Sequence, residues 1–211
     1  MQDALAAAAP SAVAHPEAQA RRELLFLLEL AYSGELGAAW AYIGHARAVR
    51  DPLERAHIAR IAREELRHRQ CLLRMLRALG GEPDPRRERK LTIVGHLIAL
   101  FCRVGGWFFP MYGAGKLEAQ NIREYEHAAR LAWVAGLHAF VEPLLEMAEV
   151  EWDHERFFRE KAQSHALWRF MPRWPVPLPR TEIRSAFARF RDACEQGELY
   201  VERVHAPLLV R

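Results

Sequence analysis

The feature that most constrains this 211-residue chain is a spacing of glutamate and histidine that occurs twice. Each half contains a Glu-x-x-His pair, and a lone glutamate precedes the pair by about thirty residues. Residues i and i+3 share one face of a helix, so both members of a pair can reach one site. Four carboxylates and two imidazoles in this order are typical of a carboxylate-bridged two-metal centre inside a four-helix bundle. The six residues are Glu35, Glu65, His68, Glu118, Glu151 and His154.

Helix geometry selects these two pairs from the five that the chain contains. Asp51, Pro52 and Glu54 fit an N-cap, a first helical position and a capping box. They predict an antiparallel hairpin, with one helix from about residue 21 to 50 and the next from residue 52 to a stop at 80–81. At about 1.5 Å per residue, the position level with Glu35 lies near residue 66. The pair at 65 and 68 fits, whereas the pair at 54 and 57 lies too close to the turn.

The second half gives the same result around a predicted break at Gly136. Glu118 lies about eighteen residues before this glycine, so its level partner should lie near residue 154. The pair at 151 and 154 fits. The remaining pairs are Glu124/His127 and Glu202/His205, and we expect their histidines, like His57, to lie away from the site.

Three further residues have alternative roles. Tyr42 and Tyr125 each follow a lone glutamate by seven residues, which indicates an old duplication of a helical hairpin. Each tyrosine could contact the ligands, although ordinary core packing is favoured for either one alone. Glu64 would either hold an imidazole from behind or remain solvated.

Composition and pattern predict an all-α chain, in which a ferritin-like four-helix bundle carries an apolar crossover segment and a C-terminal extension. Ala, Leu, Arg and Glu are abundant, as in long helices. We expect a mobile tail over residues 1–18 and the bundle over residues 19–164. The extension, residues 165–211, begins with a proline-rich irregular stretch and contains one more helix from residue 181 to about 195.

The crossover segment, residues 91–109, is apolar but carries His96 and Arg103 and is broken at 105–106. Such a segment would lie along the bundle or on a membrane surface rather than span a bilayer. We expect its aromatic cluster, residues 107–109, to line the entrance to the site. The basic residues 86–90 are interrupted by Glu88 and are interpreted as a solvated loop, so no nucleic-acid partner is expected. The three cysteines form no Cys-x-x-Cys motif, which favours the cytoplasm, with contact to the inner membrane left open.

Several blocks of residues together resemble the demethoxyubiquinone hydroxylases of ubiquinone biosynthesis, over roughly residues 23 to 160. The blocks are Gly34-Glu35-Leu36-Gly37-Ala38 with Tyr42, Glu64-Glu65-x-x-His68, the apolar crossover, Glu118 with Tyr125, and Glu151-x-x-His154. The resemblance implies a di-iron monooxygenase that hydroxylates a quinone ring near a membrane. The chain departs from that family at Glu124, where a histidine is usual, and by its C-terminal extension.

The ligand types themselves suit two iron ions, with manganese as an alternative. Glu65 and Glu151 are assigned as bridges, Glu35 and Glu118 as terminal carboxylates, and one histidine to each metal. The expected partners are a small apolar substrate, dioxygen and an unidentified electron donor. Two other functions stay open: a ferritin-like peroxidase or iron-handling protein, and a metal-free helical interaction module. Rubrerythrin-type peroxidases typically carry an additional acidic ligand where this chain has Asn121.

Overall fold

The computed structural model describes residues 16–197, which form helices and no strand in that range. The prediction of a mobile tail over residues 1–18 was wrong for residues 16–18, which belong to the first helix. Residues 1–15 and 198–211 lie outside the described range. The elements are α1 (Pro16–Ala48), α2 (Pro52–Ala78), α3 (Pro85–Val104), α4 (Phe108–Val134), α5 (His138–Gln163), the 3-10 helix η1 (Ala166–Phe170) and α6 (Arg180–Glu195).

The two predicted helix breaks position the site-bearing helices. The Asp51 side chain accepts hydrogen bonds from the backbone N–H groups of Leu53 at 2.8 Å and Glu54 at 3.4 Å, and so caps α2. Glu54 does not complete the predicted capping box, because its carboxylate instead accepts a hydrogen bond from Lys161 in α5. Gly136 has a φ of 70°, a conformation that favours glycine, and it separates α4 from α5.

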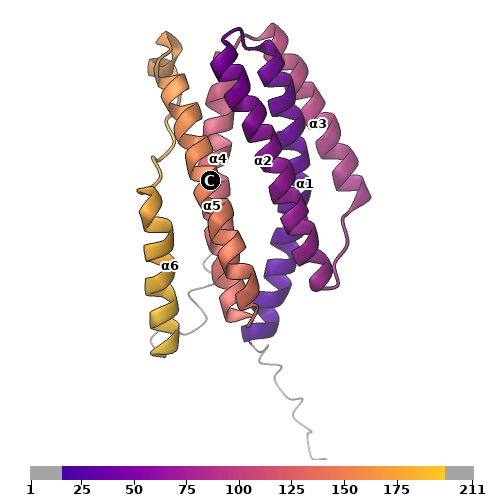
Figure 1. The fold of residues 1–211 in the computed structure, drawn as a ribbon, viewed down its shortest axis with the longest axis vertical. Helices are drawn as coiled ribbons and strands as arrows, with labels where there is room; N and C mark the ends of the chain where they lie inside the picture. Colours follow the sequence, from indigo (N-terminus) through magenta and orange to yellow (C-terminus); the bar gives the residue numbers. More distant parts are fainter. Residues whose placement is uncertain (1–15, 198–211) are drawn as a thin grey trace, which may run out of the picture.

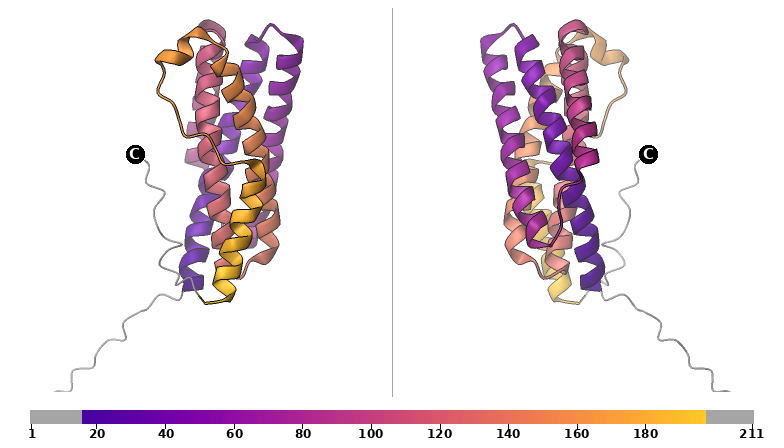
Figure 2. Two further views of the ribbon diagram at one scale, coloured as in Figure 1. Left: turned by 90° about the vertical axis from the view of Figure 1, so that its left-hand side faces the viewer. Right: turned by 90° about the vertical axis from the view of Figure 1, so that its right-hand side faces the viewer.

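Four helices, α1, α2, α4 and α5, lie side by side along their length (Figures 1 and 2). The α1–α2 and α4–α5 hairpins pack together mainly through α1 with α4, and through α2 with α5. Buried residues recur every three or four positions, as a helix with one core-facing stripe requires. They form two apolar clusters, one containing Leu24, Leu28, Leu72 and Leu144, the other Ile58, Ile61, Met111 and Phe158.

Helix α3 packs against the outer side of α1 (Figure 1). The contact is close because glycines form it: a Cβ built on Gly44 would lie 2.1 Å from the Cβ of Ala99, and one on Gly95 would lie 2.5 Å from the carbonyl oxygen of Gly37. The remainder of α3 is largely exposed, including most of its large apolar side chains. The crossover therefore lies along the bundle, which was one of the two predicted arrangements.

The prediction of a solvated loop at the basic cluster was wrong. Residues 86–90 form the first turns of α3, because Asp84 caps the helix by accepting from the Arg86 N–H at 2.9 Å and Pro85 occupies the first position. Glu88 in this turn pairs with Arg69 of α2. Glu88 thus links the start of α3 to α2 of the bundle.

Beyond α5, the chain turns back along the bundle through η1 and an extended segment, and then enters α6 (Figures 1 and 2). Helix α6 packs on α4 and α5, and in Figure 1 it lies on the opposite flank of the bundle from α3. It starts one residue before the predicted helix and ends at the predicted position, Glu195. We call residues 172–179, which contain four prolines, the proline strap.

Candidate metal centre

All six predicted ligands converge in one buried layer of the bundle. Each of α1 and α4 contributes one glutamate, and each of α2 and α5 contributes a Glu-x-x-His pair. The layer lies between the two apolar clusters, so the carboxylates and imidazoles are shielded from water on both sides. The six residues, all buried, are Glu35, Glu65, His68, Glu118, Glu151 and His154.

The six side chains form two overlapping groups, and each group can hold a metal ion. Within each group, the atoms able to bind a metal lie within 4.8 Å of one another. Two glutamates, Glu65 and Glu151, belong to both groups. Glu35 and His68 complete the first group, and Glu118 and His154 complete the second. Each Glu-x-x-His pair thus contributes one carboxylate to both groups, and this gives the layer an approximate twofold symmetry.

The imidazoles face the shared carboxylates through their Nδ1 atoms. His68 Nδ1 lies 3.0 Å from Glu151 Oε1 and 3.7 Å from Glu35 Oε1. His154 Nδ1 lies 3.3 Å from both Glu65 Oε1 and Glu151 Oε2. The contact between His68 and Glu35 shows that the predicted register between α1 and α2 is correct.

These short separations do not give every polar atom of the layer a hydrogen bond. Several polar atoms in it are buried and have no hydrogen-bond partner among the described residues, although buried polar groups are normally paired. A group of unpaired carboxylate oxygens and ring nitrogens directed to one place is what a cation site requires. The atoms are Glu35 Oε2, both side-chain oxygens of Glu65 and of Glu151, His68 Nδ1 and His154 Nδ1.

Proximity to carboxylates changes the protonation of the imidazoles when no metal is bound. Burial alone would lower the pKa of His68, but Glu151 and Glu35 outweigh burial and raise it to about 10. Burial likewise opposes charge on His154, but Glu151 and Glu64 raise its pKa to about 10. Burial would raise the pKa of Glu151, whereas the two histidines lower it far below its ordinary value. Protons on the imidazoles therefore compensate part of the negative charge.

The other two strongly shifted carboxyls move in the opposite direction. Burial raises the pKa of Glu65 well above its ordinary value, and the charges of Glu151 and Glu35 raise it further. Burial also raises the pKa of Glu118, with a further contribution from Glu151. Both glutamates consequently favour the protonated form unless a cation replaces the proton.

Two tyrosines connect the halves of the layer. The Tyr42 hydroxyl of α1 donates to Glu118 Oε1 in α4, and the Tyr125 hydroxyl of α4 donates to Glu35 Oε1 in α1. Burial and the nearby carboxylates raise the pKa of both phenols, so both remain donors. The favoured prediction of ordinary core packing was therefore wrong, and the alternative of contact with the ligands is confirmed.

Two polar residues support the ligands from outside. Glu64 Oε2 lies 2.9 Å from His154 Nε2, so this carboxylate can hold the imidazole with Nδ1 directed inward. The Asn121 amide donates to Glu118 Oε2 at 2.8 Å. Of the two roles left open for Glu64, the structure shows the contact with an imidazole, although sequence spacing could not show that this imidazole belongs to α5.

The other Glu-x-x-His pairs lie apart from this layer, and neither metal-holding group among the described residues includes them. His57 stacks on Phe157, with ring centroids 4.0 Å apart. Glu124 accepts from Gln120 at an exposed position, and His127 lines a surface pocket with Phe26. The pair Glu202/His205 lies outside the described residues.

The expected entrance at residues 107–109 is not supported. Phe108 is buried and stacks on His165, with centroids 4.6 Å apart, and Trp107 contacts the same ring. Three pockets formed by described residues have other linings. They lie between α4 and the proline strap, between α1 and α2, and beside His127.

Comparison with known proteins gives a partial likeness to a hydroxylase. The chain is 40% identical over 64 residues to a 3-demethoxyubiquinol 3-hydroxylase of Paracidovorax citrulli (strain AAC00-1). The match covers 30% of this chain and 31% of that relative, so it spans less than a third of either protein. No family model matches the chain, and no solved structure matches it. The likeness therefore does not show the family, and the chemistry has to be argued from the site.

The tyrosine contacts predict a measurable loss of stability. Tyr125→Phe removes the hydroxyl that donates to Glu35 Oε1, so that both oxygens of this carboxylate lack a hydrogen-bond donor, and we expect a cost of about 1–3 kcal/mol in the metal-free protein. Urea unfolding measures it. The control is Tyr32→Phe, which removes the hydroxyl of another buried tyrosine, in α1, that lies outside the layer. Equal losses in the two variants would contradict the role given to Tyr125.

Proposed function

We propose that this protein is a di-iron, oxygen-dependent hydroxylase that acts on a quinone-like or other small apolar molecule. Its four site-bearing helices would form a ferritin-like bundle. The observation that carries the proposal is the buried layer of four carboxylates and two imidazoles whose inward atoms have no hydrogen-bond partner among the described residues. The partial likeness to a ubiquinol hydroxylase supports the same reaction class.

The donor set fits two divalent ions of iron, with manganese as the alternative. Carboxylates and imidazoles suit these metals, and no thiolate belongs to either described group. Glu65 and Glu151 would bridge the two ions because they belong to both groups. Glu35 with His68 would hold one ion, and Glu118 with His154 would hold the other. Four carboxylates would balance the charge of two divalent cations.

When bound, two such ions supply the electrons and the oxygen binding that activate dioxygen. In hydroxylation, one oxygen atom enters a C–H bond of the substrate and the other leaves as water, with two electrons and two protons from a donor. The chain itself would hold and orient the ligands: Tyr42 and Tyr125 fix the terminal carboxylates, and Glu64 fixes one imidazole. The two apolar clusters exclude water from the layer.

Two observations weigh against the other candidate functions. A peroxidase of the rubrerythrin type would use an acidic ligand at the place of Asn121, whereas this side chain is an amide that donates to Glu118. A metal-free interaction module would have no use for a buried carboxylate layer with unpaired oxygens, which lowers stability unless a cation compensates it.

The first test is metal content. The purified protein should bind about two iron or manganese ions per chain, because each group offers three or more ligands. Glu65→Ala or His154→Ala should abolish this binding, measured by elemental analysis after iron loading and desalting. Full occupancy in both variants would contradict the assignment.

Matched controls come from the pairs that have the same spacing but lie away from the layer. His57→Ala and His127→Ala remove an imidazole three residues after a glutamate, as His154→Ala does. Both should keep full metal content. Loss of metal on replacing His57 would show that the site includes residues near the α1–α2 turn.

The second test is the reaction. Apolar small molecules would be extracted from cells grown under ¹⁸O-labelled dioxygen, with the wild-type protein and with Glu65→Ala in its place. One compound should gain a labelled oxygen only in wild-type cells, and its unhydroxylated precursor should accumulate with the variant. Identical extracts, together with peroxide turnover by the purified protein, would favour the peroxidase instead.

An apolar substrate is most accessible at a membrane surface, and we propose that α3 provides peripheral contact with one. Its outward side carries exposed apolar residues beside exposed Arg89, Lys90 and Arg103, a composition that suits an anionic lipid surface. Helix α1 is long and apolar enough to span a membrane by composition, but half of that window is buried and the helix carries Glu35. The exposed large apolar residues of α3 are Ile93, Val94, Leu97, Ile98, Leu100, Phe101 and Val104.

Sedimentation with vesicles tests this contact. The protein should co-sediment with vesicles that contain phosphatidylglycerol, and Leu97→Glu should reduce the bound fraction severalfold by placing a charge in the apolar face. Leu53→Glu is the matched control, because Leu53 is an exposed leucine at the start of α2. Equal binding of the two variants would contradict a role for α3.

A further inference from the structure

The proline strap is fastened to the bundle at several points. The Tyr112 hydroxyl of α4 donates to the carbonyl oxygen of Pro172 at 2.5 Å, and the Trp152 indole of α5 donates to the carbonyl oxygen of Leu178 at 2.8 Å. Between them, the Trp174 indole donates to the buried carboxylate of Glu155 at 2.9 Å. Its ring lies so close to Gly115 that an added Cβ would be 2.8 Å away. The strap is thus held by side chains of both helices that it crosses.

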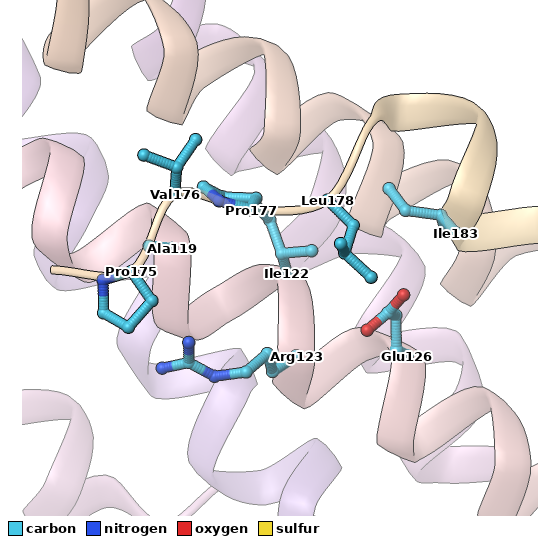
Figure 3. A pocket seen from close by; sticks show the side chains of 9 residues that line it. All are labelled: Ala119, Ile122, Arg123, Glu126, Pro175, Val176, Pro177, Leu178 and Ile183. Atoms are coloured by element: carbon cyan, nitrogen blue, oxygen red, sulfur yellow. The ribbon is translucent and has the colours of Figure 1, made fainter. Parts of the chain in front are cut away.

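The strap does not lie flat on the helices between these anchors. A pocket of about 250 Å³ remains between it and α4, and the first residues of α6 close one end (Figure 3). Prolines restrict the strap to an extended conformation and lack N–H groups, so it can bridge this space without leaving backbone donors unpaired at those positions. The strap thus forms one side of the pocket.

The walls of the pocket are apolar on two sides. Ile122 and Ile183 form buried parts of the lining, and Pro175, Val176 and Leu178 cover it from the strap (Figure 3). An apolar enclosure of this size can take a group of one or two rings and removes it from water.

One edge of the pocket carries charge. Arg123 and Glu126 of α4 both line it (Figure 3). Arg123 has no ion pair with a carboxylate within the described part of the chain. Burial raises the pKa of Glu126, although the charges of Arg130 and Arg123 oppose this effect. Glu182, the other acidic group near Glu126, is paired with Arg189. The guanidinium of Arg123 is therefore the cationic group in the lining of the pocket.

We propose that the space under the proline strap is a binding site for a small aromatic or alicyclic acid. The ring system would occupy the apolar enclosure, and the carboxylate would pair with Arg123, whose planar guanidinium suits a two-point contact with a carboxylate. This site lies apart from the candidate metal ligands and does not require them. Along α4, however, it borders the candidate metal ligand Glu118. The lining residue Ala119 directly follows Glu118, and the lining residue Ile122 lies about one helical turn further on.

Calorimetric titration of the full-length protein with 2-naphthoate tests the proposal, with and without iron loading. Binding should saturate at one molecule per chain in both forms, so its outcome is separate from that of the hydroxylase proposal. The neutral analogue 2-naphthalenemethanol should bind about tenfold or more weakly, because it lacks the charge-assisted contact. Arg123→Gln should weaken 2-naphthoate by a similar factor and leave the alcohol unchanged.

Two more variants locate the binding. Val176→Asp places a negative charge on an exposed strap position and should weaken 2-naphthoate as well. Arg63→Gln is the matched control, because Arg63 is an exposed arginine that lines the pocket between α1 and α2. It should leave binding unchanged. The proposal is overturned by no saturable binding, by equal affinity for acid and alcohol, or by loss of binding in Arg63→Gln with retention in Arg123→Gln.

Discussion

The buried layer of carboxylates and imidazoles is the constraint on which the rest of this structure depends. Removing several carboxylates from water has a large cost, and their mutual repulsion adds to it. The chain reduces this cost with protons on His68 and His154, and with donors from the tyrosines and Asn121. Inward oxygens still remain unpaired. The two apolar clusters on either side must therefore supply the stability that the layer lacks, which explains why four long helices surround one short polar section.

The approximate symmetry of the layer follows from the antiparallel packing of α1 and α4. Residues 35 and 125 are in contact, and so are residues 42 and 118. The sum of the two positions is the same in both pairs, as for any two level positions on antiparallel helices. A repeated hairpin that carries Glu and Tyr seven residues apart therefore supplies both cross-links at once. This geometry gives a physical reason for the repeat that the sequence contains.

The sequence predicted the convergence of the six residues well because helix rise is uniform and specific residues indicated the turns. Asp51, Pro52 and Gly136 fixed the two hairpin turns, and counting from them placed the ligands at matched depth. The tyrosine contacts were only the less favoured alternative, because seven residues along one helix span about 10 Å, too far for a side chain to reach the glutamate on its own helix. Their true partners lie on another helix. A contact between α1 and α4 depends on how the two hairpins pack together, and the local sequence of either hairpin does not indicate that packing.

The same distinction applies to the segments outside the four central helices. The sequence marked the proline strap as irregular, since prolines end helices, but its path is set by Tyr112, Trp152 and Trp174, whose partners lie far away in the chain. Helix α3 was recognised as apolar, yet its close approach to α1 depends on Gly44 facing Ala99. These two additions cover opposite flanks of the bundle (Figure 1). The four central helices can thus keep the buried layer fixed, while the two flanks differ: α3 exposes apolar side chains, and the proline strap lies over a pocket.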